Sequence, residues 1–336
     1  MARVGVIGAG AWGTALALLC CKNGHEVTMW SALPAEIETL KADGQNKRCL
    51  EGVPFPKELH LTAEDEDVCT NQDVLIFAVA SPYIRSTAKR LSSLIAKDQK
   101  IVSVAKGIED DTLMILTDVI ESEIPQADVA VLSGPSHAEE VGRGIPTTCV
   151  VGAKSRKSAE YLQNIFTSPV FRVYTSPDLL GMELGGALKN VIALGAGMAD
   201  GLGYGDNTKA ALITRGIAEI TRLGVAMGGK KETFTGLTGM GDLIVTCASM
   251  HSRNRRAGIL IGQGKTSDEA MKEVNQVVEG VYAAKAAKKL SDQYGIDLPI
   301  CNMVYRILME NFPAKDAVLE LMMRDSKPEH QDLWEE

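Results

Sequence analysis

The chain has 336 residues, of which 45% are hydrophobic and 23% are charged, and these values exclude an intrinsically disordered protein. A single core rarely grows to this size, so we expect two domains. The net charge of −8 argues against nucleic acid as the main partner, because phosphate backbones bind basic surfaces.

The seven cysteines indicate reduced thiols. Their number is odd, and no CxxC or Cys/His ligand spacing is present, so we expect neither disulfides nor a bound metal. The chain begins directly with a predicted strand and shows no charged region followed by a cleavage site, so we expect no signal peptide. The long apolar runs are broken by Gly, Lys or Asp, and we expect a cytoplasmic protein without membrane insertion.

The first predicted elements surround a glycine-rich turn. A strand at 4–7 is followed by the turn at 8–13, a helix to about residue 23 and a strand at 26–30. The turn, GAGAWG, has the GxGxxG pattern in the strand–turn–helix–strand context that predicts a dinucleotide site. Gly8 permits the turn, Gly10 lets the backbone approach a pyrophosphate, and Gly13 lets the helix pack on the sheet. The N-terminus of the helix supplies N–H groups and positive dipole.

The end of the second strand bears on the choice of cofactor. An acidic residue there would bind the ribose 2′-hydroxyl of NAD and repel the 2′-phosphate of NADP. The strand ends at Trp30-Ser31-Ala32, with no acid before Glu36 and no arginine to bind a 2′-phosphate, although Ser31 has a hydroxyl to donate. We therefore expect NADP or NAD, with NADPH slightly favoured.

Strands continue to alternate with helices up to about residue 176. They are predicted within 73–86, 100–110, 128–141, 147–154 and 170–176. This alternation predicts an α/β fold with a doubly wound, mostly parallel sheet, in which ligands bind beyond the carboxyl ends of the strands. Four residues at that edge are candidates by position, although ordinary turns explain each equally well: Ser81, Lys106, Gly134 and Ser136.

The second half is predicted to be all helical. Helices are expected at 178–200, 206–227, 268–291 and 299–324, with no convincing strands. We therefore expect a Rossmann-like domain at 1–180 and a helical domain at 181–336. The first of these helices contains five glycines (Gly181, Gly185, Gly186, Gly195 and Gly197), each costing about 1 kcal/mol in a helix interior. Such a helix is expected to pack closely against another helix or the first domain.

Lys189 lies in the apolar part of this helix, beside Leu188 and Val191. It is either a lysine whose stem covers apolar surface or a base whose pKa is lowered by desolvation.

Two further motifs follow. Glycines at 236, 239 and 241 form a loop before Asp242, and if a helix begins there, Asp242 and Thr246 share one face. Three arginines then fall within 252–256, SRNRR. Such a cluster is either a solvated charge run or a site for phosphate or carboxylate.

Together these motifs resemble the NAD(P)-dependent glycerol-3-phosphate dehydrogenases, specifically the bacterial biosynthetic type. The segments that carry the resemblance are GAGAWGTALA (8–17), AKGIE (105–109), SGPSHA (133–138), LKN (188–190), GxGDLxxTC (239–247), SRNRR (252–256) and VVEGVYAAKAA (277–287). It implies a 6-phosphogluconate-dehydrogenase-like arrangement of domains and reversible reduction of dihydroxyacetone phosphate to sn-glycerol 3-phosphate for phospholipid synthesis. It also suggests a homodimer, as do the apolar C-terminal helices, although core packing explains those equally well.

The resemblance implies a role for each matched residue. Lys189 is the proton donor or acceptor, Lys106 contacts substrate and cofactor, and Asp242 with Thr246 lies close to the reacting centre. The implied substrate contacts are Gly134, Ser136, Ser252, Arg253 and Asn254. The implied cofactor contacts are Gly8, Gly10, Ala11, Trp12, Gly13, Ser31, Lys106, Ala138, Arg253, Val277 and Glu279. His137 departs from the pattern, because the family often has Phe there.

The residues suggest how these groups would cooperate. Lys106 near Lys189 would favour the neutral form of Lys189, and Asp242 would orient Lys189 and keep the site from becoming too cationic. Two alternatives remain at this point. One is a reductase of the hydroxyacid or ketopantoate type, against which the SRNRR cluster argues. The other is a nucleotide sensor without catalysis, which would have no need for Lys106, Lys189, Asp242 and Arg253 together.

Overall fold

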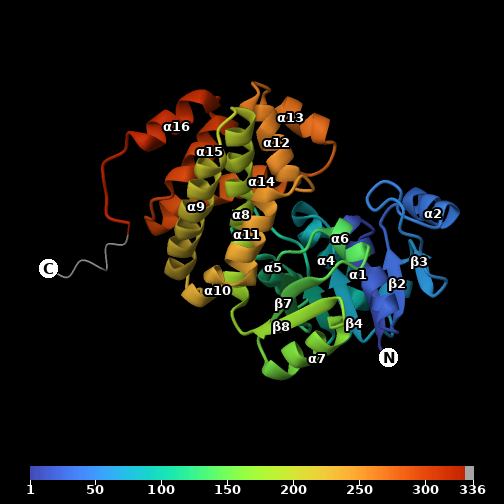
Figure 1. Ribbon diagram of the computed structural model, residues 1–336. Coiled ribbons are helices and arrows are strands. Elements are labelled where there is room, and N and C mark those ends of the chain that lie inside the picture. Colours follow the sequence, from blue (N-terminus) through green and yellow to red (C-terminus); the bar gives the residue numbers. More distant parts are fainter. Residues whose placement is uncertain (330–336) are drawn as a thin grey trace.

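Eight strands form one sheet in the order β3-β2-β1-β4-β5-β6-β7-β8. In the computed structural model, which describes residues 1–329, this sheet and its helices form the lower half of the molecule in Figure 1. The strands are β1 (Arg3–Ile7), β2 (Glu26–Trp30), β3 (Leu59–Thr62), β4 (Val74–Phe77), β5 (Lys100–Ser103), β6 (Asp128–Ser133), β7 (Thr147–Ala153) and β8 (Phe171–Ser176). Neighbouring strands are parallel except for β6 and β7. The predicted mostly parallel sheet is confirmed, whereas β3, whose sequence LHLT has only two apolar residues, was not predicted.

Helices cover both faces of the sheet. They are α1 (Ala11–Lys22), α2 (Pro34–Asp43), α3 (Asp65–Cys69), η1 (Ser81–Tyr83), α4 (Ile84–Leu91), η2 (Ser92–Leu94), α5 (Leu116–Glu123), α6 (Ala138–Gly142) and α7 (Arg156–Phe166). Residues of β4 alternate between two cores: Val74 and Ile76 pack with α1, α6 and α7, whereas Leu75 and Phe77 pack with α3, α4 and α5. Burial on both faces explains why the strand has an unbroken apolar sequence.

The helical domain follows β8 directly. Its helices are α8 (Leu179–Gly201), α9 (Asp206–Ala226), α10 (Lys231–Thr235), the π-helical turn η3 (Leu237–Gly241), α11 (Asp242–Ala248), α12 (Arg253–Gly262), α13 (Ser267–Val274), α14 (Glu279–Tyr294), α15 (Pro299–Met309) and α16 (Ala314–Met322). Residues 330–336 of the predicted second domain lie outside the described residues.

Two of the predicted long helices are wrong, because each is broken into two. The segment 268–291 contains all but the first residue of α13 and most of α14, and the break follows Asn275, which has φ of 52°. The segment 299–324 contains α15 and α16, separated by Asn311 at φ 55° and Pro313. Left-handed backbone ends a right-handed helix, and asparagine adopts it more readily than most residues.

Helix α8 forms the centre of the helical domain (Figure 1). Nearly all of its side chains are buried, including those of Glu183, Lys189 and Asn190. The expectation that no apolar run is long enough to span a bilayer is wrong for this helix by length and composition. Since 89% of its most apolar window is buried inside the protein, the apolar character reflects a core position.

Small residues bring α8 and α12 into close contact. A Cβ atom on Gly197 would lie 2.2 Å from the carbonyl oxygen of Arg255, and one on Gly258 would lie 2.2 Å from that of Leu194. Gly185 in the same way touches the backbone at Thr238, within η3. The predicted close packing of the glycine-rich helix is therefore confirmed, and it places Lys189 beside the elements that carry Asp242 and Asn254.

Candidate active site

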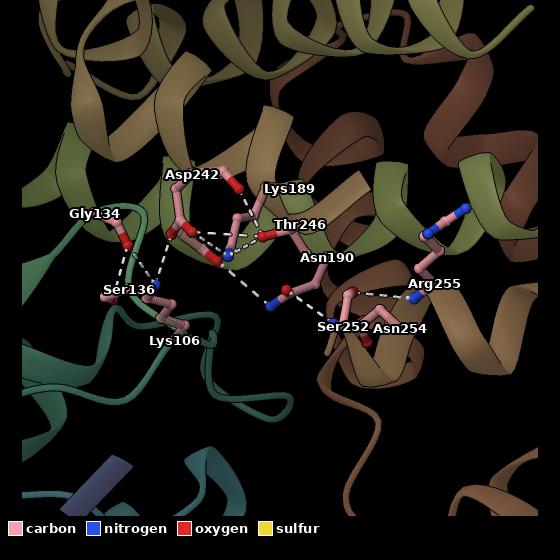
Figure 2. A network of polar contacts seen from close by, with 11 residues as sticks. Lys106, Gly134, Ser136, Lys189, Asn190, Asp242, Thr246, Ser252, Asn254 and Arg255 are labelled. Carbon is pink, nitrogen blue, oxygen red and sulfur yellow. Dashed lines mark hydrogen bonds and ion pairs between the residues drawn. The ribbon is translucent and has the colours of Figure 1, made fainter. Parts of the chain in front are cut away.

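One carboxylate joins two lysines at the junction of the two domains (Figure 2). Lys189 Nζ on α8 donates to Asp242 Oδ1 at 2.6 Å, and Lys106 Nζ, from the loop after β5, donates to Asp242 Oδ2 at 2.7 Å. The side chains are 6% exposed for Lys189, 2% for Asp242 and 18% for Lys106. The most accessible of these groups is therefore Lys106, and both lysines converge on one buried anion.

Thr246 completes the surroundings of Lys189. The expected helix begins at Asp242, and Thr246, one turn later, accepts a hydrogen bond from Lys189 Nζ at 2.6 Å. Its hydroxyl in turn donates to the backbone carbonyl of Asp242 at 2.6 Å. The glycine-rich segment before Asp242 is the π-helical turn η3 rather than the predicted loop.

Burial and the electrostatic interactions among Lys106, Lys189 and Asp242 determine the protonation of this cluster. Burial lowers the pKa of Lys189 to about 8, with Lys106 adding to the effect and Asp242 opposing it. Burial alone would raise the pKa of Asp242, but the ammonium groups of Lys106 and Lys189 outweigh it and hold this pKa below its usual value. A lysine with a pKa near neutrality can both give and take a proton, whereas the aspartate remains an anion.

Lys106 also reaches the loop after β6. Its Nζ donates to the carbonyl oxygen of Gly134 at 2.9 Å, and the hydroxyl of Ser136 donates to the same oxygen at 2.9 Å. Gly134 has φ of 143°, and a Cβ there would lie 3.1 Å from Cys149 Cα, so the position requires glycine. The structure thus brings predicted residues from two loops of the first domain together with Asp242, at the start of α11.

A second polar group begins one residue after Lys189. Asn254 Nδ2 donates to Asn190 Oδ1 at 2.9 Å, and Asn254 Oδ1 accepts from the backbone N–H of Gly280 at 2.9 Å (Figure 2). Ser252 caps α12 by accepting from the backbone N–H of Arg255 at 3.2 Å. These bonds fix the N-terminus of α12 beside α8, where its dipole favours an anion.

The arginines of the SRNRR cluster differ in their surroundings. Arg255 donates to Asp200 Oδ2 at 2.8 Å and to the carbonyl of Ala248, so it has a structural role. Arg253 is exposed and makes no hydrogen bond or ion pair with any other described residue. Arg256 is half-buried, and its Nε is buried without a partner among the described residues. Of the three, Arg253 is the exposed guanidinium available to a ligand.

The glycine-rich turn fits a dinucleotide. A Cβ on Gly13 would lie 2.0 Å from the carbonyl oxygen of Gly8, whereas one on Gly10 would meet nothing within 4 Å. No side chain caps the N-terminus of α1, and its first turn contains no acid. The indole Nε1 of Trp12 is buried without a partner among the described residues. Open backbone and uncapped amides are what a pyrophosphate needs.

The premise used for cofactor preference is wrong at the end of β2. The first turn of α2 returns Glu36 to Ser31, whose hydroxyl donates to Glu36 Oε2 at 2.5 Å. Arg48, from the segment after α2, donates to Glu36 Oε1 at 2.6 Å. Both an acid and an arginine therefore lie at this strand end. The slight preference for NADPH, which assumed that both were absent there, loses its basis.

The other predicted cofactor contacts lie on both sides of the domain junction. Glu279, at the start of α14, accepts from the backbone N–H and the hydroxyl of Ser81. Val277 precedes it and is half-buried, whereas Ala138 begins α6 and is buried. Ser81 thus joins the site as its position at the sheet edge predicted.

His137 keeps an aromatic ring where the family often has Phe. Its ring lies 5.8 Å from that of His251. Burial, with Lys189 adding to the effect, lowers the pKa of His137, so its imidazole is neutral near pH 7. The substitution therefore adds no charge beside the lysines.

Comparison with known proteins gives the family. The model for the N-terminus of NAD-dependent glycerol-3-phosphate dehydrogenase matches residues 3–159, and the model for its C-terminus matches residues 178–319. The chain belongs to the NAD-dependent glycerol-3-phosphate dehydrogenase family. The resemblance stated from the sequence motifs is thus confirmed.

Relatives of this family match along the whole chain. Proteins named glycerol-3-phosphate dehydrogenase [NAD(P)+] from Agathobacter rectalis and Fusobacterium nucleatum are 61% and 60% identical over 333 residues, covering 99% and 98% of this chain and 99% of each relative. The crystal structure of glycerol-3-phosphate dehydrogenase from Coxiella burnetii has a TM-score of 0.93 at 36% identity, covering 96% of this chain and 99% of that one.

Three polar residues of these sites were not predicted from the sequence. Asn190, within the LKN motif, links α8 to Asn254. Glu36 and Arg48 lie beyond the end of β2 in sequence, and Glu36 hydrogen-bonds both Ser31 and Arg48. Asn190 could have been predicted from its position, because it is an amide next to a candidate catalytic lysine in an apolar helix. The positions of Glu36 and Arg48 depend on how the chain folds back to the end of β2.

Proposed function

We propose that the protein catalyses the reversible reduction of dihydroxyacetone phosphate to sn-glycerol 3-phosphate with NADPH or NADH. The observation that carries this proposal is the buried Lys189, held by Asp242 and Thr246 at the junction of a dinucleotide-binding domain and a helical domain. Membership of the family supports the same reaction.

Lys189 is the proposed proton donor and acceptor. The glycine-rich turn at 8–13 would hold the cofactor, which would supply the hydride for the carbonyl carbon. The carbonyl oxygen then needs a proton, which the ammonium group of Lys189 donates; in the oxidation direction neutral Lys189 takes it back. Asp242 and Thr246 fix the position of Nζ, and the second ammonium, on Lys106, stabilises negative charge on the substrate oxygens.

The phosphate of the substrate is proposed to bind at the start of α12. Arg253 is free to pair with it, the helix dipole favours it, and Asn254 keeps one amide hydrogen beyond the bond to Asn190. Ser252, Gly134 and Ser136 are proposed contacts of the same substrate. Holding the phosphate at α12 would leave the carbonyl group toward Lys189 on the adjacent helix, and such positioning is worth several kcal/mol.

The alternative is a related reductase acting on a carboxylate substrate. The ketopantoate reductase structure from Ralstonia eutropha has a TM-score of 0.62 at 17% identity, which shows a shared fold alone. The test is NAD(P)H absorbance with the purified chain, comparing dihydroxyacetone phosphate with ketopantoate. Oxidation of either cofactor with the phosphate substrate is expected. Turnover of ketopantoate alone would contradict the proposal.

Four wider features are proposed with this function: a cytoplasmic location, a role in phospholipid synthesis, a homodimer, and a division between the two domains near residue 180, at the start of α8. Exposed Leu319, Met322 and Met323 on and after α16 support the homodimer, because they would be covered by a second copy. Light scattering of the intact chain tests it, and a monomeric mass at micromolar concentration would contradict it.

A further inference from the structure

We propose that Glu36 and Arg48 set the choice between the two cofactors at the ribose 2′ position. Glu36 favours NADH, and Arg48, released from Glu36, favours NADPH. The inference rests on the proposed dinucleotide-dependent activity, and it assigns the residues that tune it.

The pair lies where the adenosine ribose is expected. In this kind of domain the ribose that carries the 2′ group binds at the carboxyl end of β2, beside the glycine-rich turn. The backbone N–H of Gly8 donates to the carbonyl of Trp30 at 2.9 Å, so the turn and the end of β2 are in direct contact. Ser31 is the next residue, and its hydroxyl holds the carboxylate of Glu36 there.

The segment that carries Arg48 is anchored to the same turn. Buried Asn46 donates to the carbonyl of Ala9 and to the hydroxyl of Thr14, each at 2.9 Å, while its Oδ1 accepts from the backbone N–H of Cys49 at 3.2 Å. Two residues after Asn46, Arg48 is therefore held over the end of β2 rather than left on a loose loop.

The hydrogen-bonding groups of the pair are suited to two different ligands. The single hydroxyl hydrogen of Ser31 is already donated to Glu36, and the oxygen of Ser31 accepts from the backbone N–H of Leu33 at 3.2 Å. Ser31 therefore has no hydrogen left for a 2′-phosphate. Glu36 is 22% exposed, and its carboxylate has acceptor sites left for the 2′-hydroxyl of NADH.

NADPH presents the opposite requirement. Its 2′-phosphate is repelled by Glu36 and attracted by Arg48, which is 72% exposed and joined to Glu36 by one Nη2 contact. An exposed pair of this kind is weak, so a doubly charged phosphate can replace the carboxylate as the partner of Arg48. Binding of NADPH is then a competition between Glu36 and the 2′-phosphate for Arg48, whereas NADH binds to Glu36 and leaves that pair in place.

The test compares Glu36→Gln, Arg48→Gln and the control Lys47→Gln in the intact chain. Lys47 is the adjacent cation, but it pairs with Asp43 rather than with Glu36. We expect Arg48→Gln to lower kcat/KM for NADPH about tenfold and to leave NADH nearly unchanged, since a hydrogen bond to a charged group is worth about that much. Glu36→Gln should raise the NADPH-to-NADH ratio by a similar factor, and Lys47→Gln should leave the ratio unchanged.

A binding measurement separates this inference from the proposed reaction. Calorimetric titration with 2′,5′-ADP, which carries the 2′-phosphate, and with 5′-AMP, which lacks it, requires no turnover. Arg48→Gln should weaken 2′,5′-ADP alone, even if dihydroxyacetone phosphate proves not to be the substrate. Equal weakening of both nucleotides, or an unchanged cofactor ratio in Glu36→Gln, would overturn the assignment.

Discussion

Lys189 and Asp242, 53 residues apart in the chain, are joined by a 2.6 Å hydrogen bond in the core of the protein. An ammonium on an apolar helix is tolerated because this carboxylate balances its charge, and a second lysine reaches the other oxygen. The arrangement leaves Lys189 buried yet able to exchange a proton.

Replacing Lys189 with methionine should abolish most turnover. Methionine fills a similar volume without a proton to give, so kcat should fall by about 10²–10⁴-fold, the usual contribution of general acid–base catalysis. The affinity for NADPH, measured by fluorescence titration, should be unchanged, because the proposed cofactor contacts do not include Lys189. Lys285→Met on α14 is the control. A kcat within a few-fold of the unmodified protein would contradict the role of Lys189.

The two directions of the reaction should depend on pH in opposite ways. Reduction needs the ammonium form of Lys189, so its kcat/KM should fall as the pH rises through about 8. Oxidation needs the neutral amine and should rise over the same range. Asp242→Asn removes the charge that raises the pKa of Lys189, so the residual reduction activity should decline at lower pH. Parallel pH profiles in both directions would exclude Lys189 as the titrating group.

Arg253→Gln should weaken substrate binding more than it slows the chemical step. Loss of a charge-assisted contact to phosphate is expected to raise KM for dihydroxyacetone phosphate about tenfold or more. Steady-state kinetics with unphosphorylated dihydroxyacetone should show little difference from the unmodified protein. Arg255→Gln, which removes a bond to Asp200, should instead lower Tm. An equal rise in KM for dihydroxyacetone phosphate and for dihydroxyacetone would argue against phosphate recognition by Arg253.

Gly197→Ala should destabilise the helical domain. The added Cβ would lie 2.2 Å from the carbonyl oxygen of Arg255, so α8 and α12 must separate, at a cost of about 1–3 kcal/mol. Gly195→Ala, on the same helix, would meet side-chain methyl groups of Val304 at 3.3 Å and Ile300 at 4.0 Å and should be tolerated. Thermal unfolding measures both. Equal Tm values for the two variants would show that α8 and α12 can separate at Gly197 without loss of stability.

Glu183 links α8 to the start of α5 and should make stability depend on pH. Its carboxylate accepts from the backbone N–H and the hydroxyl of Thr117, and burial raises its pKa to about 8. Because the folded-state pKa is raised, the stability gained by binding a proton is complete below the usual value of 4.5 and is lost as the pH rises through about 8.

Glu183→Gln cannot ionise and should lack this loss. The Tm of Glu183→Gln minus the Tm of the unmodified protein should therefore increase from about pH 5 to about pH 8.5, a range that includes the raised pKa. Glu183→Ala, which leaves the Thr117 N–H without its acceptor, should be destabilised by about 1–3 kcal/mol throughout. A constant Tm difference for Glu183→Gln would show that Glu183 does not titrate in this range.

The α/β domain and its dinucleotide turn could be predicted from the sequence, because those signals are local: a glycine spacing between a strand and a helix, and apolar strands at regular intervals. The order of the motifs was enough to indicate the family. Helix ends at Asn275 and Asn311 escaped prediction, since the apolar pattern continues across them while the backbone reverses hand.

Which charged residues pair with one another depends on the tertiary fold. Lys106 and Asp242 are 136 residues apart, and no local pattern shows that they share one contact or that Asp242 also balances Lys189. Glu36 lies five residues beyond Ser31 in sequence but returns to it through the first turn of α2. Electrostatic partners are set by distance through space, and in a folded chain that distance depends on packing far from the residues themselves.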